Sequence, residues 1–234
     1  MSFEVKKEQK EKSSLLSFDK SSRIFATGET ISTTKYNLCI GIYISLGFII
    51  NFIMAYFCKD MILNIHPIAV IIAYFVLTLG GSIVTHRSTS PFVSTIAFFV
   101  MATGMGLVLT YFLTKYEVST VVTAFGITAG IAVVMTILAT IFPQFFISIG
   151  KGLLISLLVA IVAEIICAIF LRQYFGIFDY IIILIFCGYI GFDVARAQTF
   201  AKTMQNAIMS AADLYIDLVN ILIRVLSIIG DAKS

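Results

Sequence analysis

Three charged residues interrupt an apolar stretch near the C-terminus, which reads MSAADLYIDLVNILIRVLSIIG from Met209 to Gly230. On an α-helix, Asp213 and Asp217 lie about 40° apart around the axis, and Arg224 lies about 20° from Asp217. All three therefore share one helix face. Such a polar stripe must face the interior of a helix bundle or water, because lipid solvates charge poorly. The stripe predicts a central helix with groups that bind protons or cations.

Two further charged groups are expected at the same end of that bundle. If the helix enters the membrane near residue 208, Asp213 lies roughly 8 Å deep and Asp217 roughly 14 Å deep. Asp193 lies near the end of the preceding apolar run, and Arg87 ends the second such run. Ionisable groups within membranes mark ion or proton paths. We therefore predict a proton sensor and ion path, with a purely structural polar cluster as the alternative.

The composition sets the class of protein. Of 234 residues, 59% are hydrophobic and 12% are charged, whereas soluble domains are about a quarter charged. The mean hydropathy is +1.02, so we expect an all-α polytopic membrane protein. The four cysteines form no C-x-x-C motif, and we interpret them as small buried apolar residues. The sequence predicts no resident cofactor.

Seven apolar runs are long enough for a membrane helix, which needs about 20 residues. They cover residues 38–57, 67–86, 92–114, 119–142, 152–171, 177–197 and 208–229. We expect residues 36–234 to form one seven-helix domain whose last helix is central. Pro143 and Lys151 are expected to separate the fourth and fifth helices. Gly126 and Gly130, four residues apart, are expected to allow close helix packing.

The positive charges predict the orientation. With the N-terminus inside, eleven Lys and Arg residues flank the inner side and four flank the outer side, which is the usual bias. Residues 1–35 are then a polar cytoplasmic tail without the layout of a cleaved signal peptide. The mixed charges of this tail argue against a nucleic-acid partner. The compact loops favour a bacterial plasma membrane, and the endoplasmic reticulum is the alternative for a eukaryotic source.

At the C-terminus, GYIGFDVARAQ followed by SAADLYIDLVNILIRVLSIIG resembles the Bax inhibitor-1 family, also called the transmembrane BAX inhibitor motif family. The family signature reads Tyr-Asp-Thr-Gln and then Leu-Tyr-Leu-Asp-Phe-Ile-Asn. Phe192 and Asp193 stand at its Tyr-Asp, while Asp217 and Asn220 keep its later aspartate and asparagine. AFGITAGIAVVMT and TTKYNLCIGIYISLGF resemble the fourth and first helices of the family. The C-terminal motif is the specific part of this resemblance, and with the short tail and compact loops we expect a bacterial-type member.

The resemblance implies a seven-helix fold and a pH-sensitive calcium leak through the membrane. It also implies that Asp193 and Asp217 share a proton and that Arg87 forms a latch with Asp193. Two carboxylates in a medium of low dielectric cannot both ionise cheaply, so such a pair titrates as a unit. Calcium prefers carboxylate oxygens, and we expect the permeant ion to contact Asp193, Asp213 and Asp217. The other expected partner is membrane lipid.

The chain departs from the family pattern at several charged positions. The family arginine near the chain end aligns with Ser227, and Arg224 stands one turn earlier. We expect Arg224 to be a counter-charge for the acids on its own helix. Arg196, three residues after Asp193, competes with Arg87 as the partner of that acid.

The sequence does not decide the roles of two further side chains. Glu164 lies in the middle of the fifth apolar run, and the sequence does not indicate which way it faces. His86 lies at the end of the second run, where it is either an interfacial residue or a source of pH sensitivity.

Two other classes of function remain alternatives. Intramembrane aspartyl proteases also carry two membrane aspartates, but this chain has Gly-Phe-Asp and no Pro-Ala-Leu motif. We therefore expect no enzyme activity. The second alternative is a regulatory membrane protein that binds a membrane protease or a cell-death partner without carrying ions.

Overall fold

The computed structural model describes residues 29–167, 170 and 176–231. Within these residues the chain forms helices joined by short turns. They are α2 (Thr33–Phe57), α3 (Lys59–Leu63), α4 (Pro67–Arg87), α5 (Pro91–Leu113), α6 (Val118–Ile141), α7 (Pro143–Ile166), α8 (Ile177–Thr199) and α9 (Met204–Asp231). Six of them, α2 and α4 to α8, are long and apolar enough to cross a membrane. The chain is thus an all-helical, polytopic membrane protein, and most of the predicted tail lies outside the described residues.

Local sequence signals explain where several helices begin. The chain has three prolines, and Pro67, Pro91 and Pro143 each occupy the first turn of a helix. Proline suits this position because its missing N–H would have no partner within the helix. The Ser32 hydroxyl accepts a hydrogen bond from the Lys35 backbone N–H at 3.3 Å and caps α2.

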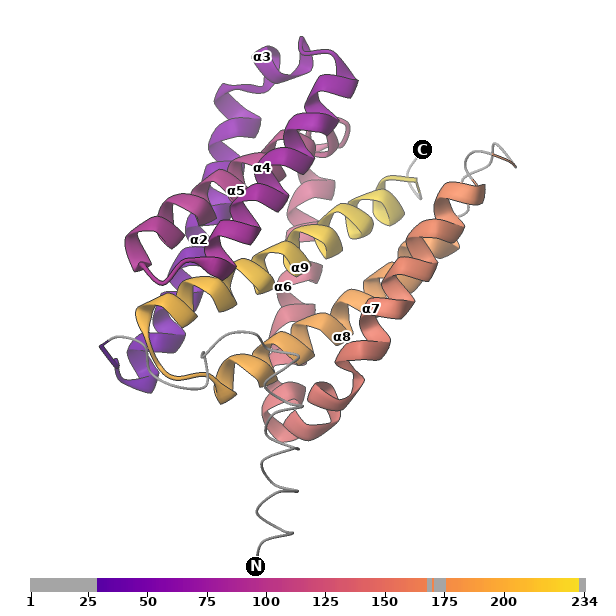
Figure 1. Cartoon of the computed structure of the whole chain (residues 1–234). Coiled ribbons are helices and arrows are strands. Elements are labelled where there is room, and N and C mark those ends of the chain that lie inside the picture. The colour runs from indigo at the N-terminus through magenta and orange to yellow at the C-terminus, as the bar shows by residue number, and fades with distance from the viewer. Residues whose placement is uncertain (1–28, 168–169, 171–175, 232–234) are drawn as a thin grey trace, which may run out of the picture.

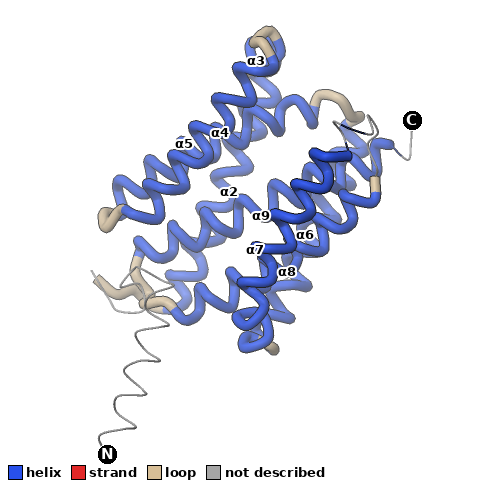
Figure 2. Tube along the Cα trace, turned by 45° about the vertical axis from the view of Figure 1, so that its right-hand side comes forward, coloured by secondary structure: helices blue, strands red, loops and turns tan. Residues whose placement is uncertain are grey.

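The helix α9 lies inside the bundle. Figures 1 and 2 show it between a group formed by α2, α4 and α5 and a group formed by α6, α7 and α8. Its main packing partners are α8, α2, α5 and α6. Ala212, Val219 and Leu226 of α9 are fully buried, whereas Val159 of α7 and Leu184 of α8 are 62% and 72% exposed. The outer helices thus present apolar side chains outward, as a lipid-facing surface requires, and the predicted central position of the last helix is confirmed.

The predicted start of the fifth span is wrong, and Lys151, which was expected to help separate the fourth and fifth helices, lies inside α7. The fifth predicted span was placed at 152–171, but α7 already begins at Pro143. Proline is a good first residue of a helix, so the break is confined to Phe142, whose φ of −122° and ψ of 54° are not helical. The predicted end of that span lies outside the described residues.

Close helix packing was expected at Gly126 and Gly130 but occurs at other glycines. A Cβ at Gly126 or Gly130 would meet no atom within 4 Å, so these two glycines make no close contact within the described part of the chain. A Cβ at Gly81 would instead lie 2.6 Å from the Ala97 carbonyl oxygen, and one at Gly104 would lie 2.7 Å from the Thr78 hydroxyl. Glycine therefore brings α4 and α5 together as a tightly packed pair.

Candidate functional site

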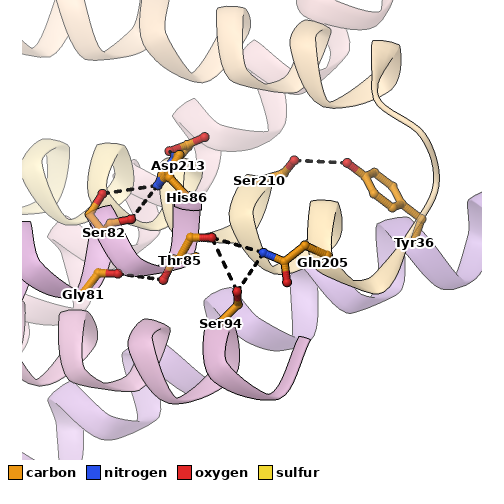
Figure 3. Close-up of polar contacts among 9 residues, drawn as sticks. All are labelled: Tyr36, Gly81, Ser82, Thr85, His86, Ser94, Gln205, Ser210 and Asp213. Carbon is orange, nitrogen blue, oxygen red and sulfur yellow. Dashed lines mark hydrogen bonds and ion pairs between the residues drawn. The ribbon is translucent and has the colours of Figure 1, made fainter. Parts of the chain in front are cut away.

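The start of α9 is tied to the turn between α4 and α5 by one side chain. Gln205 Nε2 donates hydrogen bonds to the Ser94 hydroxyl at 2.7 Å, the Ser88 carbonyl at 2.8 Å and the Thr85 carbonyl at 3.2 Å. Figure 3 shows the Gln205 amide between Thr85 and Ser94. These acceptors flank the α4–α5 turn, so Gln205 fixes the position of α9 relative to both helices.

The same end of α9 is also held to α2 and α8. The Tyr36 side chain of α2 is fully buried, and its hydroxyl lies 3.1 Å from the Ser210 hydroxyl of α9. It donates to the Ala197 carbonyl of α8 at 3.2 Å. An isolated β-bridge joins Thr30 and Thr203 just outside the helices. The ends of α2, α4 and α8 therefore converge on the first turns of α9.

His86 and Asp213 form an ion pair within this convergence. His86 Nε2 lies 2.7 Å from Asp213 Oδ1, and the two side chains are 29% and 18% exposed. His86 Nδ1 lies 2.8 Å from the Ser82 carbonyl oxygen, and Figure 3 shows the contact with Ser82 and Asp213 beside His86. A carbonyl only accepts, so Nδ1 must donate to it, and Nε2 faces a second acceptor. This geometry is satisfied when the pair holds a proton, as imidazolium with carboxylate or as imidazole with carboxylic acid.

Asp193 of α8 and Asp217 of α9 are buried together. Asp193 is 9% exposed and Asp217 is 4% exposed, and their carboxyl groups are hydrogen-bonded to each other. Carboxylates only accept hydrogen bonds, so one proton must lie between them. Within the described residues, Asp217 Oδ2 has no hydrogen-bond donor. The structure thus brings together the two acids that the sequence paired.

Other charges act on this pair. Asp213, Arg196 and His86 lie close enough to Asp193 for their charges to influence its ionisation. The Arg196 guanidinium lies 5.7 Å from the centre of the Phe192 ring and 5.2 Å from that of Phe200. We call His86, Asp193, Asp213 and Asp217 the aspartate cluster. Arg196 is a cation beside it, as the sequence allowed.

The expected latch between Arg87 and Asp193 is not formed in this structure. Arg87 is exposed, while its neighbour His86 is partly buried. Consecutive residues on a helix point about 100° apart, so the turn of α4 that directs His86 toward α9 directs Arg87 away. The contact between the end of α4 and α9 is made by His86 with Asp213.

A calcium-coordinating arrangement of the three aspartates is likewise not formed. Among the described residues, no group of three or more His, Cys, Asp or Glu side chains is arranged to hold a metal ion. Asp213 points to His86, and Asp193 and Asp217 point to each other. The carboxyl groups belong to two separate pairs, which explains why they do not converge on one point.

Arg224 has different partners from those that the sequence predicted. Its Nη1 lies 2.7 Å from Glu164 Oε1 and its Nη2 lies 3.0 Å from Glu164 Oε2. Nη1 also lies 2.8 Å from Asp179 Oδ1. The expected role as counter-charge for Asp213 and Asp217 is wrong in this structure. Seven residues of helix separate Arg224 from Asp217 by about 10 Å, and acids of α7 and α8 lie nearer.

Sequence reasoning did not identify Asp179 and left His86 and Glu164 open. Asp179 stands in the first turn of α8. Its position as an acidic residue inside a predicted membrane span could have indicated it. Asp179 is 1% exposed, and a buried acid at such a depth needs a partner. The adjacency of His86 to Arg87 gave no indication of which of them faces α9.

A known protein family accounts for nearly all of the described chain. The family model described as "Inhibitor of apoptosis-promoting Bax1" matches residues 38–234. The matched range holds the aspartate cluster and most of α2. A search of curated proteins found no match to the chain.

Proposed function

This chain belongs to the family of inhibitors of apoptosis-promoting Bax1, and on that premise we propose that it is a pH-sensitive calcium leak channel. The observation that supports the proposal is the buried, hydrogen-bonded pair of Asp193 and Asp217. A membrane-embedded acid pair of this kind responds to protons, and its ionised form attracts cations. We propose that the pair is the gate.

The proposed gate is closed while the pair holds its proton. The shared hydrogen bond joins α8 to α9. With one proton between them, Asp193 and Asp217 carry a single negative charge and not two in a medium of low dielectric. Loss of the proton as the pH rises leaves two carboxylates in contact, which repel each other and separate the two helices. The freed oxygens then attract calcium, which favours carboxylate ligands. We therefore expect the calcium leak to rise with pH.

The pair of His86 and Asp213 acts in the same direction. It also holds a proton in the observed geometry, and loss of that proton removes the charge that binds α4 to α9. Both pairs thus keep their end of the bundle closed when protonated. This agreement is the reason for assigning the closed state to low pH.

We further propose an orientation and a location. The aspartate cluster and the N-terminus face the cytoplasm, as the distribution of Lys and Arg residues favours. The membrane is the plasma membrane of a bacterium. The partners are calcium as the permeant ion and the surrounding lipid, and no catalytic step is proposed.

The test is calcium uptake by proteoliposomes that contain a calcium-sensitive dye. The wild-type protein is compared at several pH values with Asp217→Asn and with a matched control, Asp60→Asn, at an exposed acid of α3. We expect the wild type and the control to conduct calcium with the same pH dependence, and Asp217→Asn to lose both flux and pH response. Folded wild type without flux would overturn the proposal and favour the regulatory protein. Cleavage of a reconstituted peptide would favour a protease.

A further inference from the structure

A second group of charges lies along α9 far from the aspartate cluster. Arg224 of α9 faces Glu164 of α7 through two nitrogen–oxygen contacts of 2.7 and 3.0 Å. It faces Asp179 of α8 at 2.8 Å. We call these three residues the arginine clamp. Arg224 and Glu164 are 23% and 18% exposed, and Asp179 is 1% exposed.

The clamp joins two helices that otherwise have little contact. The helix α7 packs mainly on α8, and it is not among the main packing partners of α9. Few residues of α7 are buried, among them Phe146 and Ala160. The bidentate contact of Glu164 with Arg224 therefore reaches across α8 and links a peripheral helix to the central one. When the contact breaks, α7 remains packed on α8 but is no longer tied to α9.

The chemistry of the clamp differs from that of the acid pair. Arginine keeps its charge throughout the physiological pH range, and its planar fork matches a carboxylate with two parallel hydrogen bonds. In a membrane, separated charges are costly, so both acids are held to the guanidinium. The clamp is thus a closure between α7, α8 and α9 that does not need a proton.

We propose that the arginine clamp is a second gate, which holds the later half of α9 closed against α7 and α8 through the contacts of Arg224 with Glu164 and Asp179. Its consequence for calcium rests on the proposed function, whereas the closure itself does not. The clamp then limits the calcium leak that opening of the aspartate cluster allows. Because α8 contributes a residue to both, its movement at the aspartate cluster can also loosen the clamp.

The experiment separates the closure from the calcium flux. Ile182 of α8 is 2% exposed and lies one turn after Asp179. Ile182→Cys, in a protein whose four natural cysteines are replaced by serine, reports whether α8 and α9 have separated near the clamp. The probe is a membrane-impermeant thiol reagent, and calcium flux is recorded on the same proteoliposomes.

Three variants are compared with the parent. Arg224→Gln removes the clamp and leaves two acids without their partner. A triple variant, Glu164→Gln, Asp179→Asn and Arg224→Gln, removes every charge and keeps amides of similar size, so it is expected to fold even if the single variant does not. Lys115→Gln changes an exposed cation elsewhere and is the control.

We expect slow labelling of Ile182→Cys in the parent and in the control, and severalfold faster labelling in each folded variant that lacks the clamp. Calcium flux at alkaline pH, where the aspartate cluster is open, should rise severalfold in the same variants. Labelling as slow as in the parent in both clamp variants would overturn the second gate. Faster labelling without calcium flux in any sample, including the parent, would support the gate and overturn the proposed calcium function instead.

Discussion

The two halves of α9 hold their charges in opposite ways. In the first half, Asp213 contacts His86 and Asp217 contacts Asp193 of α8, and the geometry of each contact calls for a proton between the two groups. In the second half, two acids meet one arginine, and the contacts are between fully charged groups. The first arrangement changes with pH because its cohesion depends on protons. The second persists because guanidinium does not lose its proton under physiological conditions.

This difference suggests a division of labour along one helix. A pH-dependent contact is suited to sensing, whereas a permanent ion pair is suited to holding helices together. Each group of charges on α9 has partners on two outer helices. The partners in the aspartate cluster come from α4 and α8, and those in the arginine clamp come from α7 and α8. The helix α8 contributes to both, so movement at one end can be transmitted to the other through a single rigid helix.

The largest expected effect is on stability at the arginine clamp. Arg224→Met should lower the free energy of unfolding by about 3 kcal/mol, because removal of one member of a partly buried ion pair leaves the other charges unpaired. Chemical denaturation in detergent measures the loss. The charge-free triple variant should lose less, and an equal or greater loss in that variant would show that the clamp stabilises by packing and not by charge.

The next effect is on the pH response at the other end. Asp193→Asn should keep the protein folded, because an amide still donates a hydrogen bond to Asp217. It should flatten the dependence of calcium leak on pH, since the pair no longer exchanges a proton. Flux measured between acidic and alkaline pH tests this. An unchanged pH profile in Asp193→Asn would mean that the acid pair is not the sensor.

A smaller effect is expected at His86. Loss of the histidine proton as the pH rises weakens its contact with Asp213, so this pair contributes part of the pH response. His86→Gln removes that part and should raise the leak at acidic pH, where the wild-type pair is protonated. Identical pH profiles for His86→Gln and the wild type would assign the whole response to Asp193 and Asp217.

Gln205 should contribute modestly to the placement of α9. Gln205→Leu removes hydrogen bonds to the α4–α5 turn and should cost about 1 kcal/mol of stability, the usual size for such contacts. Gln144→Leu, at an exposed position at the start of α7, is the matched control. A loss in the control as large as in Gln205→Leu would show that the effect is not specific to the turn.

The smallest effect is expected at Arg87. The side chain is exposed and is not among the charges that act on Asp193, so Arg87→Ala should change the leak little, although the family resemblance implies a latch there. Arg196→Ala should shift the pH response more, because the charge of Arg196 acts on Asp193. A leakier Arg87→Ala protein beside an unaltered Arg196→Ala protein would restore the latch.

The sequence indicated the membrane helices and the pairing of Asp193 with Asp217, since length, hydropathy and a short motif suffice for these. It could not indicate the partners of Arg224 or Asp213. Those partners come from helices far apart in the chain, and their identity depends on how the helices rotate against one another. The choice between His86 and Arg87 turned on about 100° of rotation. Helix rotation also decides which glycines lie at a helix contact. The sequence therefore could not show that Gly81 and Gly104, and not Gly126 and Gly130, allow close packing.

Infrared spectroscopy of the protonated carboxyl group tests the central claim most directly. The claim is that Asp193 and Asp217 share one proton in the closed state and release it on opening. With leak recorded on the same proteoliposomes, we predict a carboxylic-acid band that disappears as the pH rises, in step with the increase in calcium leak. The band should be altered in Asp217→Asn and unchanged in Asp60→Asn. Absence of the band in the closed protein, or its loss without any change in leak, would contradict the account.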